Sequence, residues 1–304
     1  MHKLLVLVLF LGQFYCAESR YIRKFQEKKI THYTFATKLV DFQPIFRLQV
    51  RLPGQKKKKV LNFILDTGSN VSILNASTFP GKYPKKILKV KSFLKERKEE
   101  YSLVRLNLFQ ENKLLLARAL FYTTKFHSRL NFDGIIGNNI LSRFKIFLEL
   151  PERVTFIRKN SKLDFISTQF DGSIIEYNRS HIILPAYLGS KPLFFIFDTG
   201  AGISFLNPEN IRGLESYKIG EKSFYDLSGE FNQASAYDLP NFCLVKENLC
   251  EKRMEFVAGK SIRNFLGKYP VDGLLGINLI NRYYILIDYD KKVMYFNRKD
   301  NQIP

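Results

Sequence analysis

The chain contains the segment Asn62-Phe-Ile-Leu-Asp66-Thr67-Gly68-Ser69 and, further on, the segment Phe194-Phe-Ile-Phe-Asp198-Thr199-Gly200-Ala201. In each segment a run of apolar residues, typical of a buried strand, leads into Asp-Thr-Gly. A second apolar strand follows both times, at 71–74 and at 203–206. The two aspartates are 132 residues apart (198 − 66 = 132). One Asp-Thr-Gly can arise by chance, but two in matching surroundings indicate an internal repeat.

A second pair of matching segments lies downstream of the first. Asp133-Gly-Ile-Ile-Gly137 corresponds to Asp272-Gly-Leu-Leu-Gly276, at an offset of 139 residues (272 − 133 = 139). Each is followed by a stretch that suits one short helix, 138–144 and 277–283, and then by two more strands. Because the two offsets are nearly equal, the order of the motifs predicts a duplicated domain with a small insertion in the second copy.

Most of the chain is expected to form β-structure, since apolar and β-branched runs alternate with turns rich in Gly, Pro and Lys. The repeat divides the chain into a first lobe at about 21–159 and a second lobe at 161–304, with the likeliest join at 158–162. A chain of 304 residues is long enough for each lobe to bury its own core.

Two aspartates on repeated loops suit acid–base hydrolysis. Carboxyl groups a few ångströms apart share one proton, and their pKa values split. One can then act as the base toward a water molecule, while the other acts as the acid toward a carbonyl oxygen. We therefore expect Asp66 and Asp198 to form a catalytic pair that hydrolyses amide bonds.

The residues beside the two aspartates have roles that fit this chemistry. Gly68 and Gly200 lack side chains, so the chain can turn sharply and backbone N–H groups can approach a carboxylate. Thr67 and Thr199 are expected to form hydrogen bonds across the centre, between the lobes. Ser69 is expected to donate a hydrogen bond to its aspartate, whereas Ala201 cannot, which would make the two aspartates inequivalent.

These motifs resemble those of the aspartic peptidases of the pepsin and retroviral-protease superfamily, and they look most like bacterial retropepsin-like proteins with two fused lobes. The resemblance covers both lobes and rests on Asp-Thr-Gly and Gly-apolar-apolar-Gly in each. It implies an all-β fold of two duplicated, closed β-barrel lobes, with one short helix per lobe and a cleft between them. It also implies an aspartic endopeptidase that acts as a monomer on a peptide or protein, with water as the nucleophile and no metal or organic cofactor.

The same resemblance implies a hairpin, the flap, that covers the cleft. In the second lobe the candidate is the stretch 225–232, which includes Tyr225 and has Gly229 as its expected tip. The equivalent stretch of the first lobe, Lys91-Ser-Phe-Leu-Lys-Glu-Arg-Lys-Glu-Glu100, contains no glycine and is highly charged. We therefore expect one of the two hairpins to be missing or remodelled, as in the single-flap arrangement of pepsin.

The N-terminus is typical of a secretion signal at residues 1–17. Lys3 precedes an apolar run at 4–11 that is too short to span a bilayer, and small residues follow. Two processing routes remain open: ordinary cleavage near Ala17, or a lipoprotein signal with lipidation of Cys16. The protein is expected to be exported to the periplasm or cell envelope, and any contact with a membrane would be through the lipid anchor.

Two cysteines, Cys243 and Cys250, remain after the signal. They lie in a stretch that reads as two short strands around a Lys-Glu-Asn turn. An exported protein can form a disulfide across such a hairpin. Two half-buried free thiols are the alternative, and zinc is not expected because no other ligand lies nearby in the sequence.

The net charge of +20 fits several interpretations. It can favour nucleic acid, an anionic membrane surface or an acidic substrate. The abundance of Lys, Phe, Ile, Asn and Tyr, with no Trp, instead indicates a compositional bias. No nucleic-acid partner is expected, because no nucleic-acid motif accompanies the charge.

Three other interpretations compete with catalysis. The strongest is a catalytically inactive protein that binds a peptide between the lobes of the same fold. A basic protein that coats an anionic surface, and lobes that pair with those of another chain, are the remaining two. Asp133 and Asp272 are expected to hold their loops rather than react, and His32, His127 and His181 belong to no repeated motif.

Overall fold

A computed structural model describes residues 32–78, 84–91, 96–126, 131–161, 163, 171–177, 180–214, 217–225, 231–245, 248–259, 262 and 270–299. Within these residues the secondary structure is almost entirely β, and no helix is long and apolar enough to cross a membrane. The signal region with Cys16, the expected tip at Gly229, and His127 lie outside the described residues.

In the part of the first half that the structure describes, there are ten strands and one short helix. They are β1 (His32–Val40), β2 (Gln43–Arg51), β3 (Lys59–Leu65), β4 (Ile73–Asn75), β5 (Lys85–Lys91), β6 (Glu96–Gln110), β7 (Lys113–Thr124), β8 (Gly134–Ile136), α2 (Asn138–Leu141), β9 (Phe144–Glu149) and β10 (Arg153–Arg158).

The second half repeats this order with one strand split in two. Its elements are β11 (Asp171–Ile174), β12 (Glu176–Tyr177), β13 (Ile182–Leu188), β14 (Lys191–Phe197), β15 (Ser204–Leu206), the 3₁₀ turn η2 (Pro208–Asn210), β16 (Lys218–Tyr225), β17 (Phe231–Cys243), β18 (Cys250–Ala258), β19 (Gly273–Leu275), α4 (Ile277–Ile280), β20 (Tyr283–Asp288) and β21 (Val293–Arg298).

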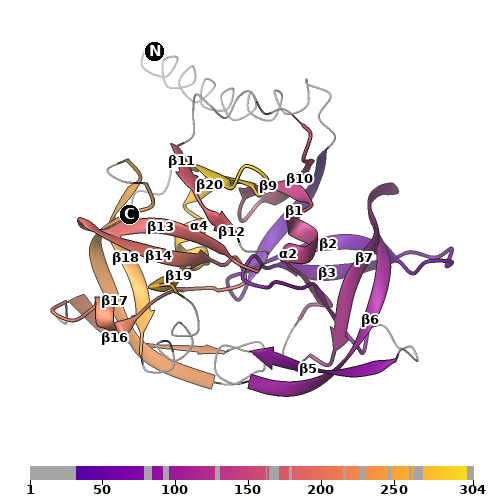
Figure 1. Cartoon of the computed structure of the whole chain (residues 1–304), viewed down its shortest axis with the longest axis horizontal. Helices are drawn as coiled ribbons and strands as arrows, with labels where there is room; N and C mark the ends of the chain where they lie inside the picture. Colours follow the sequence, from indigo (N-terminus) through magenta and orange to yellow (C-terminus); the bar gives the residue numbers. More distant parts are fainter. Residues whose placement is uncertain are drawn as a thin grey trace, which may run out of the picture.

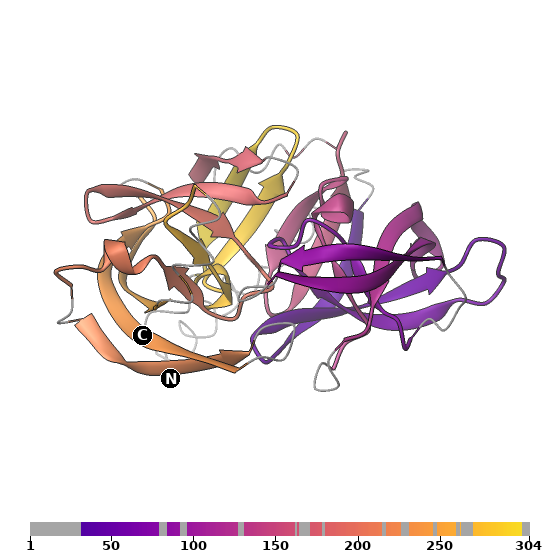
Figure 2. The same cartoon turned by 60° about the horizontal axis from the view of Figure 1, so that its bottom comes forward.

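Each half closes into a six-stranded barrel. The first barrel has the strand order β2-β3-β8-β4-β7-β6, and a β6–β2 pairing closes it. The second has the order β13-β14-β19-β15-β18-β17, closed by β17–β13. Closure leaves no unpaired strand edge in either ring. The all-β, two-lobed architecture predicted from the repeat is therefore confirmed, and Figures 1 and 2 show the two lobes side by side.

A shared sheet joins the two lobes. Its strand order is β11-β21-β20-β9-β10-β1, so that β9 of the first lobe pairs with β20 of the second (Figure 1). Phe147 lies opposite Leu286, and these residues correspond to each other at the 139-residue offset (286 − 147 = 139). The approximate twofold axis of the duplication therefore passes through this pair, and the lobes are joined as in a symmetric dimer.

Aromatic side chains fill both barrels, and two of the three Phe residues in each barrel, Phe63 with Phe195 and Phe121 with Phe256, occupy corresponding places. Phe46, Phe63 and Phe121 pack together in the first barrel, and Phe195, Phe242 and Phe256 in the second; all are buried. The rings bury large apolar areas and contribute a favourable packing term of roughly 0.5–1.5 kcal/mol per pair beyond that burial. These cores hold β3 and β14, the strands that lead to Asp66 and Asp198, in fixed positions.

Candidate active site

The two Asp-Thr-Gly loops begin where buried central strands end. β3 pairs in parallel with β8, and the N–H of Asp66 donates to the carbonyl of Ile136 at 3.1 Å. The N–H of Asp198 likewise donates to the carbonyl of Leu275 at 3.0 Å. Each Gly-apolar-apolar-Gly strand is therefore a support that lies directly beside an aspartate of its own lobe.

The two loops meet at the junction of the lobes. A Cβ atom added to Gly68 would lie 2.3 Å from Cγ of Asp198, and one added to Gly200 would lie 2.6 Å from Cγ of Asp66. Each carboxyl group therefore packs against the glycine of the opposite loop, where any larger residue would displace it. The carboxyl groups of Asp66 and Asp198 also share a hydrogen bond with each other.

Backbone groups and burial set the protonation of this pair. Oδ1 of Asp66 accepts hydrogen bonds from the N–H groups of Gly68 and Ser69, both at 2.9 Å, and Oδ1 of Asp198 accepts one from Gly200 at 2.8 Å. Burial raises the pKa of Asp66 well above its ordinary value, and the charge of Asp198 raises it further. Burial also raises the pKa of Asp198. Carboxyl groups this close hold one proton between them, and their titration belongs to the pair rather than to either residue.

Thr67 and Thr199 connect the loops beneath the carboxyl groups. The hydroxyl of Thr67 donates to the carbonyl of Phe197 at 2.8 Å, and the hydroxyl of Thr199 donates to that of Leu65 at 2.7 Å. Each hydroxyl also accepts the backbone N–H of the opposite threonine at 3.0 Å. Both side chains are fully buried, so these four bonds across the lobes fix the separation of the aspartates.

The expected role of the Ser69 hydroxyl is wrong. Its Oγ donates to the carbonyl of Val71 at 2.8 Å, and only the backbone N–H of Ser69 reaches Asp66. The nearby carbonyl is a ready acceptor within the same turn, and local side-chain to backbone bonds of this kind are common for serine. Burial raises the pKa of Asp198, and a hydrogen bond from the backbone amide of Ala201 partly offsets this rise. Ala201 therefore supports its aspartate through the backbone, although its methyl side chain cannot form a hydrogen bond.

A second symmetric support was missed in the sequence. In the first lobe the hydroxyl of Ser72 accepts the N–H of Gly137 at 2.9 Å and donates to Asn139 at 2.7 Å. Ser204, Gly276 and Asn278 repeat the arrangement at 2.9 and 2.8 Å. The signal was present, because Ser72 and Ser204 each lie six residues after their aspartate (72 − 66 = 204 − 198 = 6).

Asn138 forms an asymmetric contact between the lobes. Its buried side chain donates to the carbonyls of Thr67 at 2.7 Å and Ser180 at 2.8 Å, and it accepts from the hydroxyl of Tyr289 at 3.0 Å. The corresponding residue of the second lobe is Ile277, which cannot form these bonds. The sequence places both residues at the start of a short helix but does not indicate that one of them joins the lobes.

Gln43 and His181 occupy corresponding positions and contact opposite loops. Ile45 pairs with Ile64 and Ile183 with Ile196, so the start of β2 matches the start of β13. Nε2 of Gln43 donates to the carbonyl of Gly200 at 3.3 Å, and the imidazole of His181 has a hydrogen bond to the backbone of Gly68. Burial nevertheless lowers the pKa of His181. No role for His181 was predicted from the sequence, because the residue at the corresponding position, Gln43, is unlike it.

Both lobes carry a hairpin at the place expected for a flap. In the second lobe β16 pairs with β17 up to Tyr225 opposite Phe231. In the first lobe β5 pairs with β6 up to Lys91 opposite Glu96, so of the two alternatives, a missing or a remodelled hairpin, the missing one is wrong. Figure 1 shows one hairpin from each lobe along the lower edge, away from the shared sheet. The tips, 92–95 and 226–230, lie outside the described residues.

The remaining predicted residues lie away from the aspartate pair. Asp133 accepts the N–H of Asn62 and Asp272 that of Phe194, both at 2.9 Å, so each holds its loop as expected. Cys243 and Cys250 face each other across β17 and β18 and form a disulfide.

Comparisons with known proteins agree with this geometry. Residues 42–149 match the family model of the retroviral aspartyl protease. The fold is similar to that of an aspartic proteinase from Irpex lacteus, with a TM-score of 0.57 and 11% identity, over 89% of this chain and 98% of that one. It is also similar to basic 7S globulin from soybean, with a TM-score of 0.55 and 11% identity, over 88% of this chain and 95% of that one. No curated protein matches the sequence.

Proposed function

We propose that the chain is an aspartic endopeptidase in which Asp66 and Asp198 activate water; the match of residues 42–149 to the retroviral aspartyl protease model and the similarity of the whole fold to an aspartic proteinase support this proposal. Its substrate is a peptide or protein that lies extended between the lobes, and one chain suffices because both aspartates belong to it. The single observation that carries the proposal is the hydrogen-bonded pair of carboxyl groups at the lobe junction, with Asp66 buried and Asp198 half-buried, each packed against the glycine of the opposite loop.

The roles of the two aspartates are assigned from their surroundings: burial and the charge of Asp198 both raise the pKa of Asp66, whereas backbone hydrogen bonds partly offset the effect of burial on Asp198. Asp198 carries the negative charge, so it takes a proton from water as the water oxygen bonds to the carbonyl carbon. Asp66 gives its proton to the carbonyl oxygen, which yields a neutral tetrahedral diol. The proton on Asp198 then passes to the amide nitrogen as the C–N bond breaks, and a hydroxyl proton of the diol returns to Asp66. The products are a carboxylic acid and an amine, and the pair regains its starting state.

The test compares Asp66→Asn and Asp198→Asn with the wild type on a mixed peptide library. An amide cannot serve as the acid or the base, so kcat/KM should fall by roughly 10³-fold or more in each variant. Asn is nearly isosteric with Asp, and the thermal unfolding midpoint should stay close to that of the wild type. Product formation followed by mass spectrometry gives both the rates and the cleavage sites.

Asp133→Asn is the matched control, because Asp133 also belongs to the repeated motif. Its amide oxygen can still accept the N–H of Asn62, so the variant should lose less than about tenfold in kcat/KM. Equal activity of the wild type and both active-pair variants would end the catalytic assignment. If the wild type binds peptides but cuts none of them, the chain is instead an inactive peptide-binding protein.

We also propose that the protein is exported, to the periplasm or cell envelope. The disulfide Cys243–Cys250 supports this location, since disulfides persist in oxidising compartments and are rare in the cytosol. The test is the N-terminal sequence and mass of the mature protein. A start shortly after Ala17 indicates simple cleavage, lipid on Cys16 indicates an anchored form, and an intact Met1 would contradict export.

A further inference from the structure

The first lobe contains a cavity that is lined by residues between 115 and 160 and by none from the Asp-Thr-Gly loops. It has a volume of about 290 Å³, and its lining residues are Leu115, Leu116, Arg143, Phe144, Arg158, Lys159 and Asn160. Leu115 and Phe144 are buried, whereas the guanidinium-bearing residues are exposed at its edge. An apolar floor with two arginines at the rim is a combination that suits an amphipathic anion.

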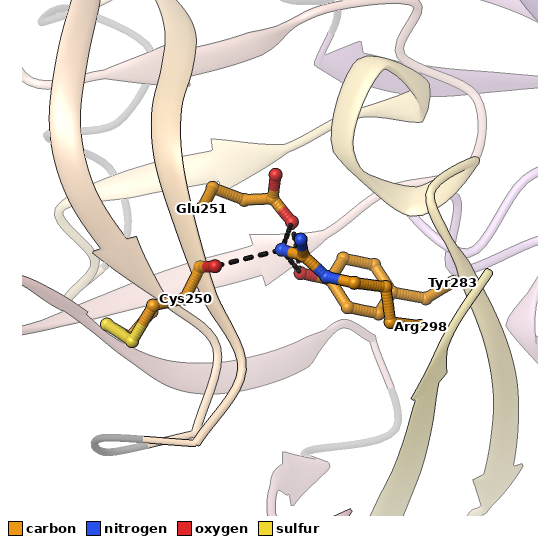
Figure 3. Close-up of a disulfide and its surroundings, with 5 residues drawn as sticks. Cys250, Glu251, Tyr283 and Arg298 are labelled. Atoms are coloured by element: carbon orange, nitrogen blue, oxygen red, sulfur yellow. Dashed lines mark hydrogen bonds and ion pairs between the residues drawn. A yellow bond between two sulfur atoms is a disulfide. The ribbon is translucent and has the colours of Figure 1, made fainter. Parts of the chain in front are cut away.

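The corresponding place in the second lobe is already filled by an anion of the chain itself. Glu251 is 5% exposed, and its carboxylate accepts a hydrogen bond from Arg282 at 2.6 Å. Arg298 and the hydroxyl of Tyr283 also donate to it. Figure 3 shows Glu251, Tyr283 and Arg298 converging beside the disulfide, and Arg298 additionally donates to the carbonyl of Cys250 at 2.8 Å. Two arginines and one phenol therefore enclose a single carboxylate.

Strand pairing shows that the two places correspond. Arg158 pairs with Phe144 across β9 and β10, as Arg298 pairs with Tyr283 across β20 and β21. Nε of Arg143 donates to the carbonyl of Asn139 at 3.4 Å, and Nε of Arg282 donates to that of Asn278 at 3.1 Å. The two arginines thus have the same positions in both lobes.

The residue that matches Glu251 is Leu116. Leu116 lies opposite Leu108 on β6, and Glu251 lies opposite Phe242 on β17. Leu108 and Phe242 in turn pair with matching positions, Val50 on β2 and Leu188 on β13. The first lobe has therefore kept both arginines of the cluster but has Leu in place of Glu and Phe in place of Tyr.

This substitution leaves the arginines of the first lobe without a carboxylate. Among the described residues, Arg143 donates to a backbone carbonyl and Arg158 to the hydroxyl of Tyr33 at 2.9 Å, and neither has an acidic partner. Lys159 at the rim pairs with Asp290 and is thus already occupied. The charges that enclose Glu251 in one lobe face an open cavity in the other.

We propose that this cavity binds a carboxylate carried on an apolar chain, with the carboxylate between Arg143 and Arg158 and the apolar part against Leu115, Leu116 and Phe144. The ligand carboxylate takes the place that Glu251 occupies in the second lobe. Guanidinium groups bind planar carboxylates well, and the floor excludes water from the apolar part. The volume of about 290 Å³ suits a short fatty acid or the C-terminal apolar residue of a polypeptide.

The first experiment measures binding of octanoate to the purified wild-type chain by titration calorimetry, with octanol as the uncharged control of equal length. Octanoate should bind at least about tenfold more tightly, because only it engages the arginines. The variant Arg143→Gln/Arg158→Gln should lower the octanoate affinity by about the same factor, while octanol binding stays unchanged. Equal affinity for the two probes, or octanoate binding that survives in the double variant, would overturn the proposal.

A second variant transfers the internal carboxylate from one lobe to the other. Leu116→Glu should fill the site as Glu251 does, so octanoate should no longer bind or raise the thermal unfolding midpoint. Leu116→Gln is the matched control: it has nearly the same shape without the charge, and it should retain measurable octanoate binding. If the glutamate and glutamine variants bind octanoate equally, the carboxylate is not what the site recognises and the proposal fails.

A short peptide ending in leucine, with a free or an amidated C-terminus, distinguishes the two ligand sources. Tighter binding of the free peptide than of octanoate identifies a polypeptide C-terminus, and the reverse identifies a fatty acid. Either result supports the shared chemistry, whereas no binding of any carboxylate at millimolar concentration contradicts it. The octanoate and octanol measurements use no peptide, so their outcome is independent of whether the chain cleaves peptides.

Discussion

At the Asp-Thr-Gly loops the two lobes are interchangeable, whereas the residues around these loops have diverged. Asp66 and Asp198 each accept a backbone N–H of their own loop. The hydroxyls of Thr67 and Thr199 each accept the backbone N–H of the opposite threonine. At the start of β2 and the corresponding start of β13, by contrast, Gln43 of one lobe corresponds to an unlike residue, His181, of the other. The residues along the approximate twofold axis each serve both lobes at once, so a change in one leaves a buried partner unsatisfied in the other. The residues around the loops, such as Asn138, form bonds that have no counterpart in the other lobe, so they are free to vary.

The net charge shows how far the divergence extends. Residues 32–159 contain 25 Lys and Arg against 9 Asp and Glu, a balance of 25 − 9 = +16. Residues 160–304 contain 17 of each, a balance of 17 − 17 = 0. A compositional bias of the whole chain would have raised the net charge of both lobes. It therefore does not explain why only the first lobe is strongly positive. The positive charge belongs to the first lobe as a unit.

The largest effect is expected where the symmetry is strictest. Thr67→Val removes the hydroxyl that serves Phe197 and Thr199, and Thr199→Val removes its counterpart for Leu65 and Thr67. Each variant leaves two buried backbone groups unsatisfied and should lower the free energy of unfolding by about 2–4 kcal/mol. Chemical denaturation measures both.

The double variant Thr67→Val/Thr199→Val tests whether the two threonines act as one network. Its loss should be smaller than the sum of the single losses, because the four bonds are interdependent. Strict additivity, or a single variant as stable as the wild type, would show that the junction is not the shared element described above.

An intermediate effect is expected where the junction is asymmetric. Asn138→Leu abolishes the bonds to Thr67, Ser180 and Tyr289 and should lower the free energy of unfolding by about 1–3 kcal/mol. The matched change in the other lobe, Ile277→Leu, conserves volume and should cost less than about 1.5 kcal/mol. Equal losses in the two variants, measured by thermal unfolding, would mean that Asn138 joins the lobes no more than Ile277 does.

The smallest effect concerns pH. The imidazole of His181 contacts Gly68, against which the carboxyl of Asp198 packs, and burial lowers the pKa of the imidazole. Among the described residues, the other titratable groups on the adjoining elements are Asp66 and the phenols of Tyr177 and Tyr289, and burial raises the pKa of Tyr289 so that it stays neutral. Below its own pKa, His181 is positive and favours the ionised aspartate pair.

The variant His181→Gln keeps a hydrogen-bond donor but cannot become charged. The pair should then take up its second proton at a higher pH, so the acidic limb of the pH–rate profile should shift upward by about half to one pH unit. The alkaline limb should move little, because His181 is neutral there. Gln43→His should shift the acidic limb in the opposite direction. Profiles that superimpose for all three proteins would contradict the coupling.

The features predicted correctly from the sequence are those that occur in both copies of the duplicated domain. Asp66 and Asp198, the threonines and the Gly-apolar-apolar-Gly strands each occur in two copies, so the repeat itself identified them, and the barrels followed from strand periodicity. The hairpin of β5 and β6 was misjudged because the segment 91–100 contains no glycine. Pairing of the two strands does not itself require a glycine. The Ser69 hydroxyl was misassigned because a rotamer and a competing carbonyl decide its partner.

Contacts between unlike residues could not be predicted in this way. Gln43 and His181, or Leu116 and Glu251, correspond only after the strands are aligned through their pairing partners, and those offsets differ from 132 and 139. The carboxylate of Glu251 and the cavity beside Leu116 therefore became comparable only in three dimensions.

The pairing of β9 with β20 has one more consequence, which concerns concentration. Two separate copies of a single lobe would have to meet by diffusion, and their reactive centre would fall apart on dilution below the dissociation constant. Here the two halves are tethered, so their encounter is intramolecular and proceeds at a fixed effective molarity. The centre therefore stays assembled at any dilution, and neither half has to be a good partner for a copy of itself.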